Sequence, residues 1–143
     1  MKKKISLFNK ILGFLIKKGK KTKAKYILVK TFLKISTFFK KPLTFILNKL
    51  YLIMNVFVET KTIKVKRSRY IVPFPINLKR RIYLITKWII LSVNTQTSKN
   101  NFSEKLFLEM YSLLKGLKTK SILLKNLNNS KALLNRSNLH YRW

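Results

Sequence analysis

The sequence predicts a mainly α-helical protein: a single domain over residues 1–143, built as a helical bundle of about six helices, with a protruding basic β-hairpin between the third and fourth helices. Three observations support this fold class. Apolar residues recur at helical spacing along most of the chain. Alternating apolar and polar residues interrupt that pattern once, at about residues 58–76. The chain is 47% hydrophobic and 13% aromatic, which is enough for a packed core.

Three helices are predicted before the hairpin. Residues 5–16 carry apolar side chains on one face, and this helix is expected to stop at Gly19. A second helix follows from Thr22 and ends before Lys40-Lys41-Pro42. Proline suits the first turn of a helix, so the third helix is expected to open there and to reach Met54. Because that segment is apolar nearly all round, we expect it to be the central helix of the bundle.

The chain after the hairpin is also predicted to be helical. A fourth helix runs from Leu78, and a polar loop at residues 94–101 separates it from a fifth helix that ends near Gly116. The pattern over residues 119–139 is less regular. It indicates two short helices, with Asn128-Asn129-Ser130 as a kink or cap between them.

The hairpin reads VETKTIKVKRSRYIVPFP from Val58 onward, and its turn is expected at Lys66-Arg67-Ser68-Arg69. Burying unpaired ammonium or guanidinium groups costs several kcal/mol each, so the hairpin is expected to protrude toward something anionic. An alternative is that the lysines only keep an exposed edge strand from pairing with other strands.

The charge balance indicates an anionic partner. Lys and Arg total 33 against 3 for Asp and Glu, which gives a formal net charge of +30. A free monomer would repel itself strongly, so we expect folding to depend on a polyanion. Nucleic acid and an anionic membrane surface are the two partner classes that fit.

The same composition argues against an enzyme. The chain has no cysteine, one histidine and no aspartate, so disulfides, cysteine-based metal sites and most hydrolytic mechanisms lack their residues. The three acidic residues are Glu59, Glu104 and Glu109. We expect Glu59 and Glu109 to form internal ion pairs with lysine or arginine. No catalytic residue, metal site, cofactor or small-molecule substrate is predicted.

Three groups of residues carry a resemblance to a known family. The hairpin region has Val58-Glu59 with Lys61, then Tyr70, Val72-Pro73, Arg80-Arg81 and Trp88. Gly19-Lys20-Lys21-Thr22 lies near the start, and His140-Tyr141-Arg142-Trp143 lies at the end. In this order and spacing they resemble the universal small-subunit ribosomal protein seven family. Two departures are that Lys66-Arg67 replaces a frequent Gly-Gly pair at the turn, and that lysines replace a more arginine-rich run after Gly116.

The resemblance implies a structural constituent of the small ribosomal subunit that supports translation. Such a protein would bind the 3′ major domain of the small-subunit rRNA, help nucleate assembly of the head, and contact neighbouring head proteins. Its arm would lie beside the exit-site tRNA and the path of the departing mRNA. The abundance of Lys, Asn, Ile and Phe is typical of an AT-rich organellar genome, so we expect a mitochondrial ribosome in the matrix, with the plastid as the alternative.

The predicted RNA-binding residues are cationic or aromatic, and they come from the early corner, the hairpin, the start of the fourth helix and the C-terminal region. Arginine can fork onto a phosphate, and aromatic rings can stack on bases. The residues are Lys20, Lys21, Lys61, Lys64, Lys66, Arg67, Arg69, Lys79, Arg80, Arg81, Lys118, Lys120, Arg136, His140, Tyr141, Arg142 and Trp143. The hairpin, the arginine pair and the early corner are expected to form one continuous surface.

Two alternatives remain open at this stage. The chain can instead be a basic amphipathic membrane-surface protein, with helices at residues 5–16 and 43–58 lying on anionic lipid. The residues 5–16 are too short for the roughly 20 that a spanning helix needs, and Asn9 and Lys10 interrupt them, which disfavours an anchor or signal segment. The second alternative concerns residues 140–143, which either touch RNA or tuck into the bundle as a closing tail.

Overall fold

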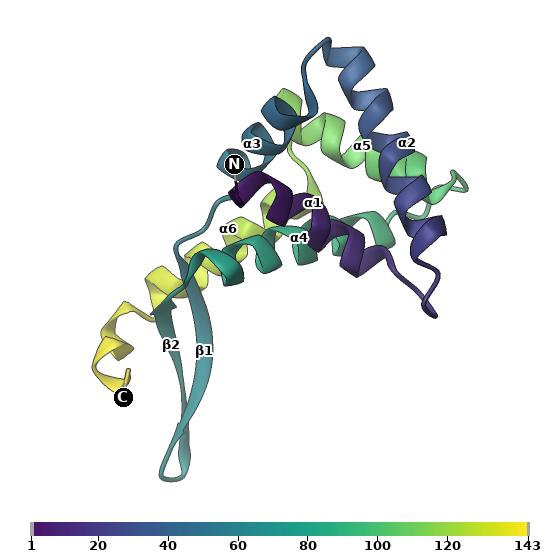
Figure 1. Ribbon diagram of the computed structural model, residues 1–143. Helices are drawn as coiled ribbons and strands as arrows, with labels where there is room; N and C mark the ends of the chain where they lie inside the picture. The colour runs from purple at the N-terminus through teal and green to yellow at the C-terminus, as the bar shows by residue number, and fades with distance from the viewer. Residues whose placement is uncertain (1, 143) are drawn as a thin grey trace.

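The fold is mainly helical, with one hairpin between the third and fourth helices, as predicted (Figure 1). The structure is a computed structural model that describes residues 2–142, with side chains from residue 7 onward. In chain order the elements are α1 (Lys2–Leu15), α2 (Lys21–Phe39), α3 (Leu43–Met54), β1 (Val58–Val65), β2 (Ser68–Pro75), α4 (Leu78–Asn94), α5 (Phe102–Lys115), α6 (Lys120–Leu134) and the 3₁₀ helix η1 (Arg136–Tyr141).

Helix α4 is the centre of the bundle, so the prediction that the third helix would be central is wrong. Nine residues of α4 are buried, whereas α3 buries four. Helices α1, α3, α5 and α6 all contact α4. Several side chains of α3 face outward instead, including Phe45 and Leu52, which are 50% and 70% exposed. An all-round apolar pattern therefore reflected a helix with a surface apolar face, not one enclosed on every side.

The helix boundaries follow from local backbone chemistry. Helix α2 ends at Phe39 because the next residue, Lys40, has a left-handed φ of +48°, and Pro42 is the residue just before α3. Helix α5 ends at Lys115, and the next residue, Gly116, has a φ of +77°, which suits glycine because it has no Cβ. The amide N–H groups of Gly116 and Leu117 donate to the carbonyls of Leu113 and Ser112, which closes the last turn.

The hairpin consists of two eight-residue antiparallel strands. Val58 pairs with Pro75 at its base, and Val65 pairs with Ser68 at its tip. The connecting loop is therefore only Lys66 and Arg67, and Lys66 has a φ of +53°. At about 3.3 Å per residue the strands span roughly 26 Å. Figure 1 shows this arm extending away from the helices, with the C-terminal segment beside it.

Helix α6 is continuous over residues 120–134, so the predicted kink or cap at Asn128-Asn129-Ser130 is wrong. Asn128 instead contacts the arm from within the helix. Its Nδ2 donates to the carbonyl of Val58 at 2.8 Å, which ties α6 to the base of the arm. One turn earlier, Lys125 Nζ donates to the carbonyl of Ile53 at 2.6 Å. The two bonds together hold α6 against the end of α3 and the start of β1.

Candidate nucleic-acid interface

The arm carries a set of exposed cations, and the acidic residue on its strands, Glu59, lies at the base of the arm. Lys64 and Arg69 are directly opposite each other in the hairpin, so they lie on the same face of the two-stranded ribbon. Like charges in that position repel and would destabilise the hairpin unless an anion lies between them. The five predicted RNA-binding residues of the arm are all exposed: Lys61, Lys64, Lys66, Arg67 and Arg69.

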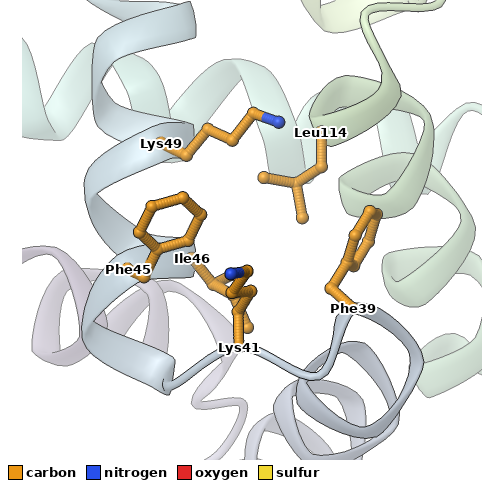
Figure 2. Close-up of a pocket in the computed structure, with 6 residues that line it drawn as sticks. All are labelled: Phe39, Lys41, Phe45, Ile46, Lys49 and Leu114. Atoms are coloured by element: carbon orange, nitrogen blue, oxygen red, sulfur yellow. The ribbon is translucent and has the colours of Figure 1, made fainter.

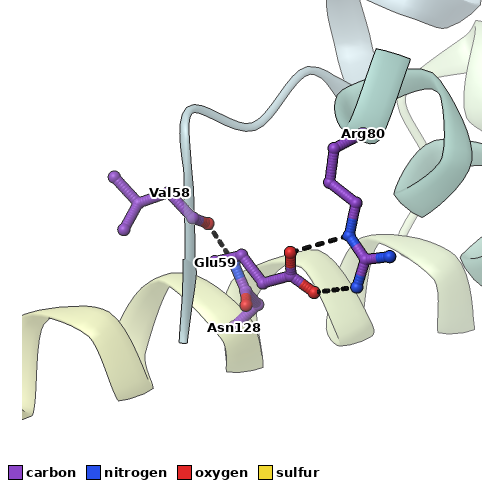
Figure 3. Close-up of polar contacts among 4 residues, drawn as sticks. All are labelled: Val58, Glu59, Arg80 and Asn128. Atoms are coloured by element: carbon purple, nitrogen blue, oxygen red, sulfur yellow. Dashed lines mark hydrogen bonds and ion pairs between the residues drawn. The ribbon is translucent and has the colours of Figure 1, made fainter. Parts of the chain in front are cut away.

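The base of the arm is fixed to α4 by an ion pair. Arg80 Nε donates to Glu59 Oε2 at 2.8 Å, and its Nη2 donates to Glu59 Oε1 at 2.6 Å (Figure 3). The hydrogen bonds from Arg80 lower the pKa of the Glu59 carboxyl, and Glu59 raises the pKa of Arg80. This is the internal pair predicted for Glu59. The Arg80 guanidinium also lies 4.7 Å from the centre of the Tyr83 ring.

Arg81 likewise has partners within the protein. Its Nε donates to the carbonyl of Ile76 at 3.1 Å, and its guanidinium lies 4.4 Å from the centre of the Phe57 ring. The arginine pair at the start of α4 therefore holds the arm at its base, and only the remaining N–H groups of each guanidinium are left for a phosphate. Lys79, one residue earlier, is exposed.

The C-terminal segment lies along β2, so neither tail alternative describes it fully. Asn138 Nδ2 donates to the carbonyl of Ile71 at 3.1 Å, and Arg142 Nε donates to the carbonyl of Pro73 at 2.9 Å. These are alternate carbonyls on the edge of β2 that no strand pairs. Tyr141 stacks on Tyr70 with ring centres 4.5 Å apart. The tail therefore braces the arm instead of closing the bundle.

Some residues of the C-terminal segment are exposed, while others contact β2 and hold the arm. His140 is exposed, and its Nδ1 lies 2.8 Å from the Ser137 carbonyl. Arg136 is also exposed, at the start of η1. Trp143, the last predicted RNA-binding residue, lies outside the described residues.

The other predicted residues lie toward the opposite end of the molecule from the arm. Lys20 and Lys21 are exposed in the turn between α1 and α2, and Lys17 beside them shares a cavity lining with residues at the C-terminal end of α4. Lys118 is exposed in the turn between α5 and α6, and Lys120 is exposed at the first position of α6. Helix α4 has 17 residues and is about 25 Å long. The two groups of predicted residues thus lie about 25 Å apart along α4.

The sequence comparisons identify the family. The chain matches the model of the family described as ribosomal protein S7p/S5e over residues 1–136. The chain belongs to that family. It is also 37% identical over 86 residues to the small ribosomal subunit protein uS7m of Reclinomonas americana, a match covering 60% of this chain and 53% of that protein. The chain thus matches about half the length of this curated relative, and the resemblance found from the hairpin, the early corner and the tail is confirmed.

The second predicted ion pair, at Glu109, is wrong. In this S7p/S5e protein Glu109 is 5% exposed, and its carboxylate is held by neutral donors. Its Oε1 accepts from Ser121 Oγ at 2.5 Å and from the Ser121 backbone N–H at 3.4 Å, and its Oε2 accepts from Gln96 Nε2 at 3.1 Å. Ser121 is in the first turn of α6, so Glu109 supplies an anion to a helix N-terminus. It joins α5 to the loop after α4 and to the start of α6 through these neutral donors.

The ion pair at the arm base gives a pH-dependent prediction for the S7p/S5e chain. Because the pKa of Glu59 is lowered from 4.5 in the folded state, its contribution to stability is present above that pH and is lost as the pH falls through the folded pKa. Glu59→Gln should lower the free energy of unfolding by about 0.5–1 kcal/mol near neutral pH, since the pair is bidentate but partly exposed. Denaturant unfolding across acidic pH should show this difference shrinking below the folded pKa.

Glu104→Gln is the matched control. Glu104 lies in the first turn of α5 and forms no ion pair with any residue from 7 to 142. Its substitution should remove only a small helix-dipole contribution, on the order of a few tenths of a kcal/mol. A Glu59→Gln variant that kept the wild-type pH dependence would contradict the role given to the pair.

Proposed function

We propose that this chain is a structural constituent of the small subunit of a mitochondrial ribosome. It would bind the 3′ major domain of the small-subunit rRNA, help nucleate the head, and contact neighbouring head proteins. The observation that carries this proposal is the braced arm: five exposed cations on a two-stranded ribbon that is tied to α4, α6 and the C-terminal segment, in a chain of the S7p/S5e family. The role is structural, and no catalytic step is assigned.

The physical reason for RNA is the distribution of charge over a rigid shape. Folded RNA presents phosphates at fixed positions, and proteins recognise it through its shape and backbone. The arm holds Lys64 and Arg69 opposite each other where a phosphate would relieve their repulsion. The lysines at the other end of α4 then lie about 25 Å away and would meet a second segment of the same RNA. A binder of this kind gains orientation from two separated contacts.

We also propose where the arm tip lies. In the small subunit it would stand beside the exit-site tRNA and the path of departing mRNA, as the family resemblance implies. The proposed compartment is the mitochondrial matrix, which rests on the AT-rich residue usage of the chain and on the relative designated uS7m. A density map of small subunits from purified mitochondria of the source organism would test both points. Finding the chain in plastid ribosomes would contradict the proposed mitochondrial compartment but would agree with the proposed role in the small ribosomal subunit.

The membrane-surface alternative loses much of its basis in the fold. The apolar faces of α1 and α3 contribute Leu7, Ile11, Ile46, Leu50 and Met54 to the buried core, so these side chains are not available to lipid. Among residues 2–142, no helix has the length and apolar content to cross a bilayer.

A paired binding experiment tests the proposed function. The protein is titrated with the cognate rRNA head fragment and with anionic vesicles over a range of salt concentrations. With roughly 6–10 phosphate contacts, RNA affinity should fall by about 10³- to 10⁵-fold between about 50 and 200 mM salt. Vesicle binding that exceeds binding to the rRNA fragment would overturn the proposal in favour of a membrane-surface protein.

A further inference from the structure

A cavity in the angle between α2 and α3 has the composition of a nucleobase site. It measures about 210 Å³ and is lined by Phe39, Lys41, Phe45, Ile46, Lys49 and Leu114. Figure 2 shows the Phe39 and Phe45 rings on opposite sides of this hollow, with Lys49 toward one end and Lys41 toward the other. The buried side chains of Ile46 and Leu114 complete an apolar lining. We name this cavity the α2–α3 slot.

Aromatic rings continue from the slot across the surface of α5. Phe39 lies 5.6 Å from Tyr111, and Tyr111 lies 4.9 Å from Phe38, measured between ring centres. Phe38 is 58% exposed, although it is a large apolar side chain. The apolar groups that would normally be buried in a core therefore form a row of π-faces at the surface here.

Lysine ammonium groups lie over these same rings. Lys115 Nζ is 4.6 Å from the centre of Tyr111 and 5.9 Å from that of Phe38, and Lys41 Nζ is 5.8 Å from the centre of Phe45. The three glutamates of the chain are not among the residues that line the slot. Aromatic faces interleaved with cations are the pattern by which proteins bind single-stranded nucleic acid. The faces stack on bases while the cations neutralise phosphates.

We propose that the α2–α3 slot binds one unpaired base of an RNA strand, held between the Phe39 and Phe45 side chains, with the flanking phosphates on Lys41 and Lys49. For the identity of the RNA, the inference rests on the function proposed above. The slot is preformed, because the left-handed Lys40 and the following Pro42 fix the angle between the two helices. An acidic peptide is the competing occupant, but a hollow with an aromatic ring on each side matches a flat base better than it matches a peptide chain.

The test compares two oligonucleotides that differ only in their bases. One is a fluorescein-labelled single-stranded oligoadenylate, and the other has the same backbone with abasic sites throughout. Phe45→Leu keeps an apolar side chain at a half-exposed position and removes one π-face, so the fold should tolerate it. We expect it to weaken oligoadenylate binding roughly tenfold and to leave abasic binding unchanged. Lys49→Gln should weaken both, with a salt slope lower by about 1.

Tyr26→Leu is the matched control, because Tyr26 is also exposed and has a lysine ammonium 5.9 Å from its ring centre, but it is not part of the slot. It should bind both oligonucleotides as the wild type does. Equal losses of oligoadenylate affinity in Phe45→Leu and Tyr26→Leu, or no loss in either, would overturn the proposal that the slot binds a base. So would an acidic peptide that binds more tightly than oligoadenylate and is lost in Phe45→Leu.

The same variant separates the slot from the proposed function. If wild-type protein fails to bind the rRNA head fragment, the proposed function fails whatever the oligonucleotides do. If the fragment binds normally to both proteins and Phe45→Leu has no effect on oligoadenylate, only the slot fails. Crosslinking of a 4-thiouridine oligonucleotide to the peptide spanning residues 39–49 gives a direct positive result, and crosslinks confined to other peptides contradict the assignment.

Discussion

Replacing all five arm cations by glutamine should lower affinity for the rRNA head fragment by roughly 10²- to 10⁴-fold near 100 mM salt. The salt slope of binding should decrease by about 4–5, because each neutralised phosphate contributes close to 0.9. The fold should survive, since these side chains are exposed and the hairpin is held by bonds at its base and edge. Removing the Lys64–Arg69 repulsion should even favour the free hairpin. Fluorescence anisotropy over a salt series measures both quantities.

A charge-matched variant distinguishes the contribution of the arm to RNA affinity from the contribution of the total charge. It replaces five exposed lysines of the body by glutamine, namely Lys23, Lys25, Lys30, Lys34 and Lys99. The two variants have the same net charge, so any non-specific attraction to a polyanion falls equally in both. We expect the body variant to lose much less affinity. If both variants lost the same affinity and the same slope, binding would depend on charge alone and the arm would have no special place in it.

The sequence predicts the arm well because the signals for a hairpin are local. The alternating strand residues, the short turn and the lysines that are costly to bury all lie within about 20 residues of one another. The contacts of the C-terminal segment with β2 could not be predicted in this way. Asn138 and Ile71 are 67 positions apart, and only the path of α6 through the fold brings the amide to that carbonyl. Asn128 shows the same limit, because an asparagine that suggests a helix break from sequence is instead a tether to Val58.

The candidate site shows a similar division. Exposure of the arm lysines follows from their charge, and the structure has them exposed. Arg80 and Arg81 also have partners within the protein, Glu59 and Phe57 respectively. These partners are more than 20 positions away in the sequence, and only the fold brings them close to the start of α4. The α2–α3 slot was missed for the same reason. Phe39 and Phe45 flank Lys40-Lys41-Pro42 in the sequence, which is a detectable signal, but only the angle between two helices places the rings on opposite sides of one cavity.

The largest stability loss is expected at Glu109. Glu109→Leu should lower the free energy of unfolding by about 3 kcal/mol, because it removes the acceptor of two Ser121 bonds and leaves buried donors unpaired. Ser121 is fully buried, so water cannot replace the carboxylate without disrupting the start of α6. Glu109→Gln should cost less, about 1 kcal/mol, since one amide oxygen can still accept from Ser121. Urea denaturation at constant salt measures both changes.

The loss of stability in Glu109→Leu should extend to the arm, since α6 connects Glu109 to the C-terminal segment that contacts β2. If the start of α6 loosens, then Asn128, Asn138 and Arg142 are held less firmly against the hairpin. Hydrogen exchange should therefore rise in residues 120–142 and in β2 of Glu109→Leu, while the amides of α4 stay protected. Glu104→Leu is the control, because Glu104 makes no ion pair with residues 7–142 and lies in the first turn of α5. Faster exchange spread evenly over the helices would mean general destabilisation and would contradict a specific link between Glu109 and the arm.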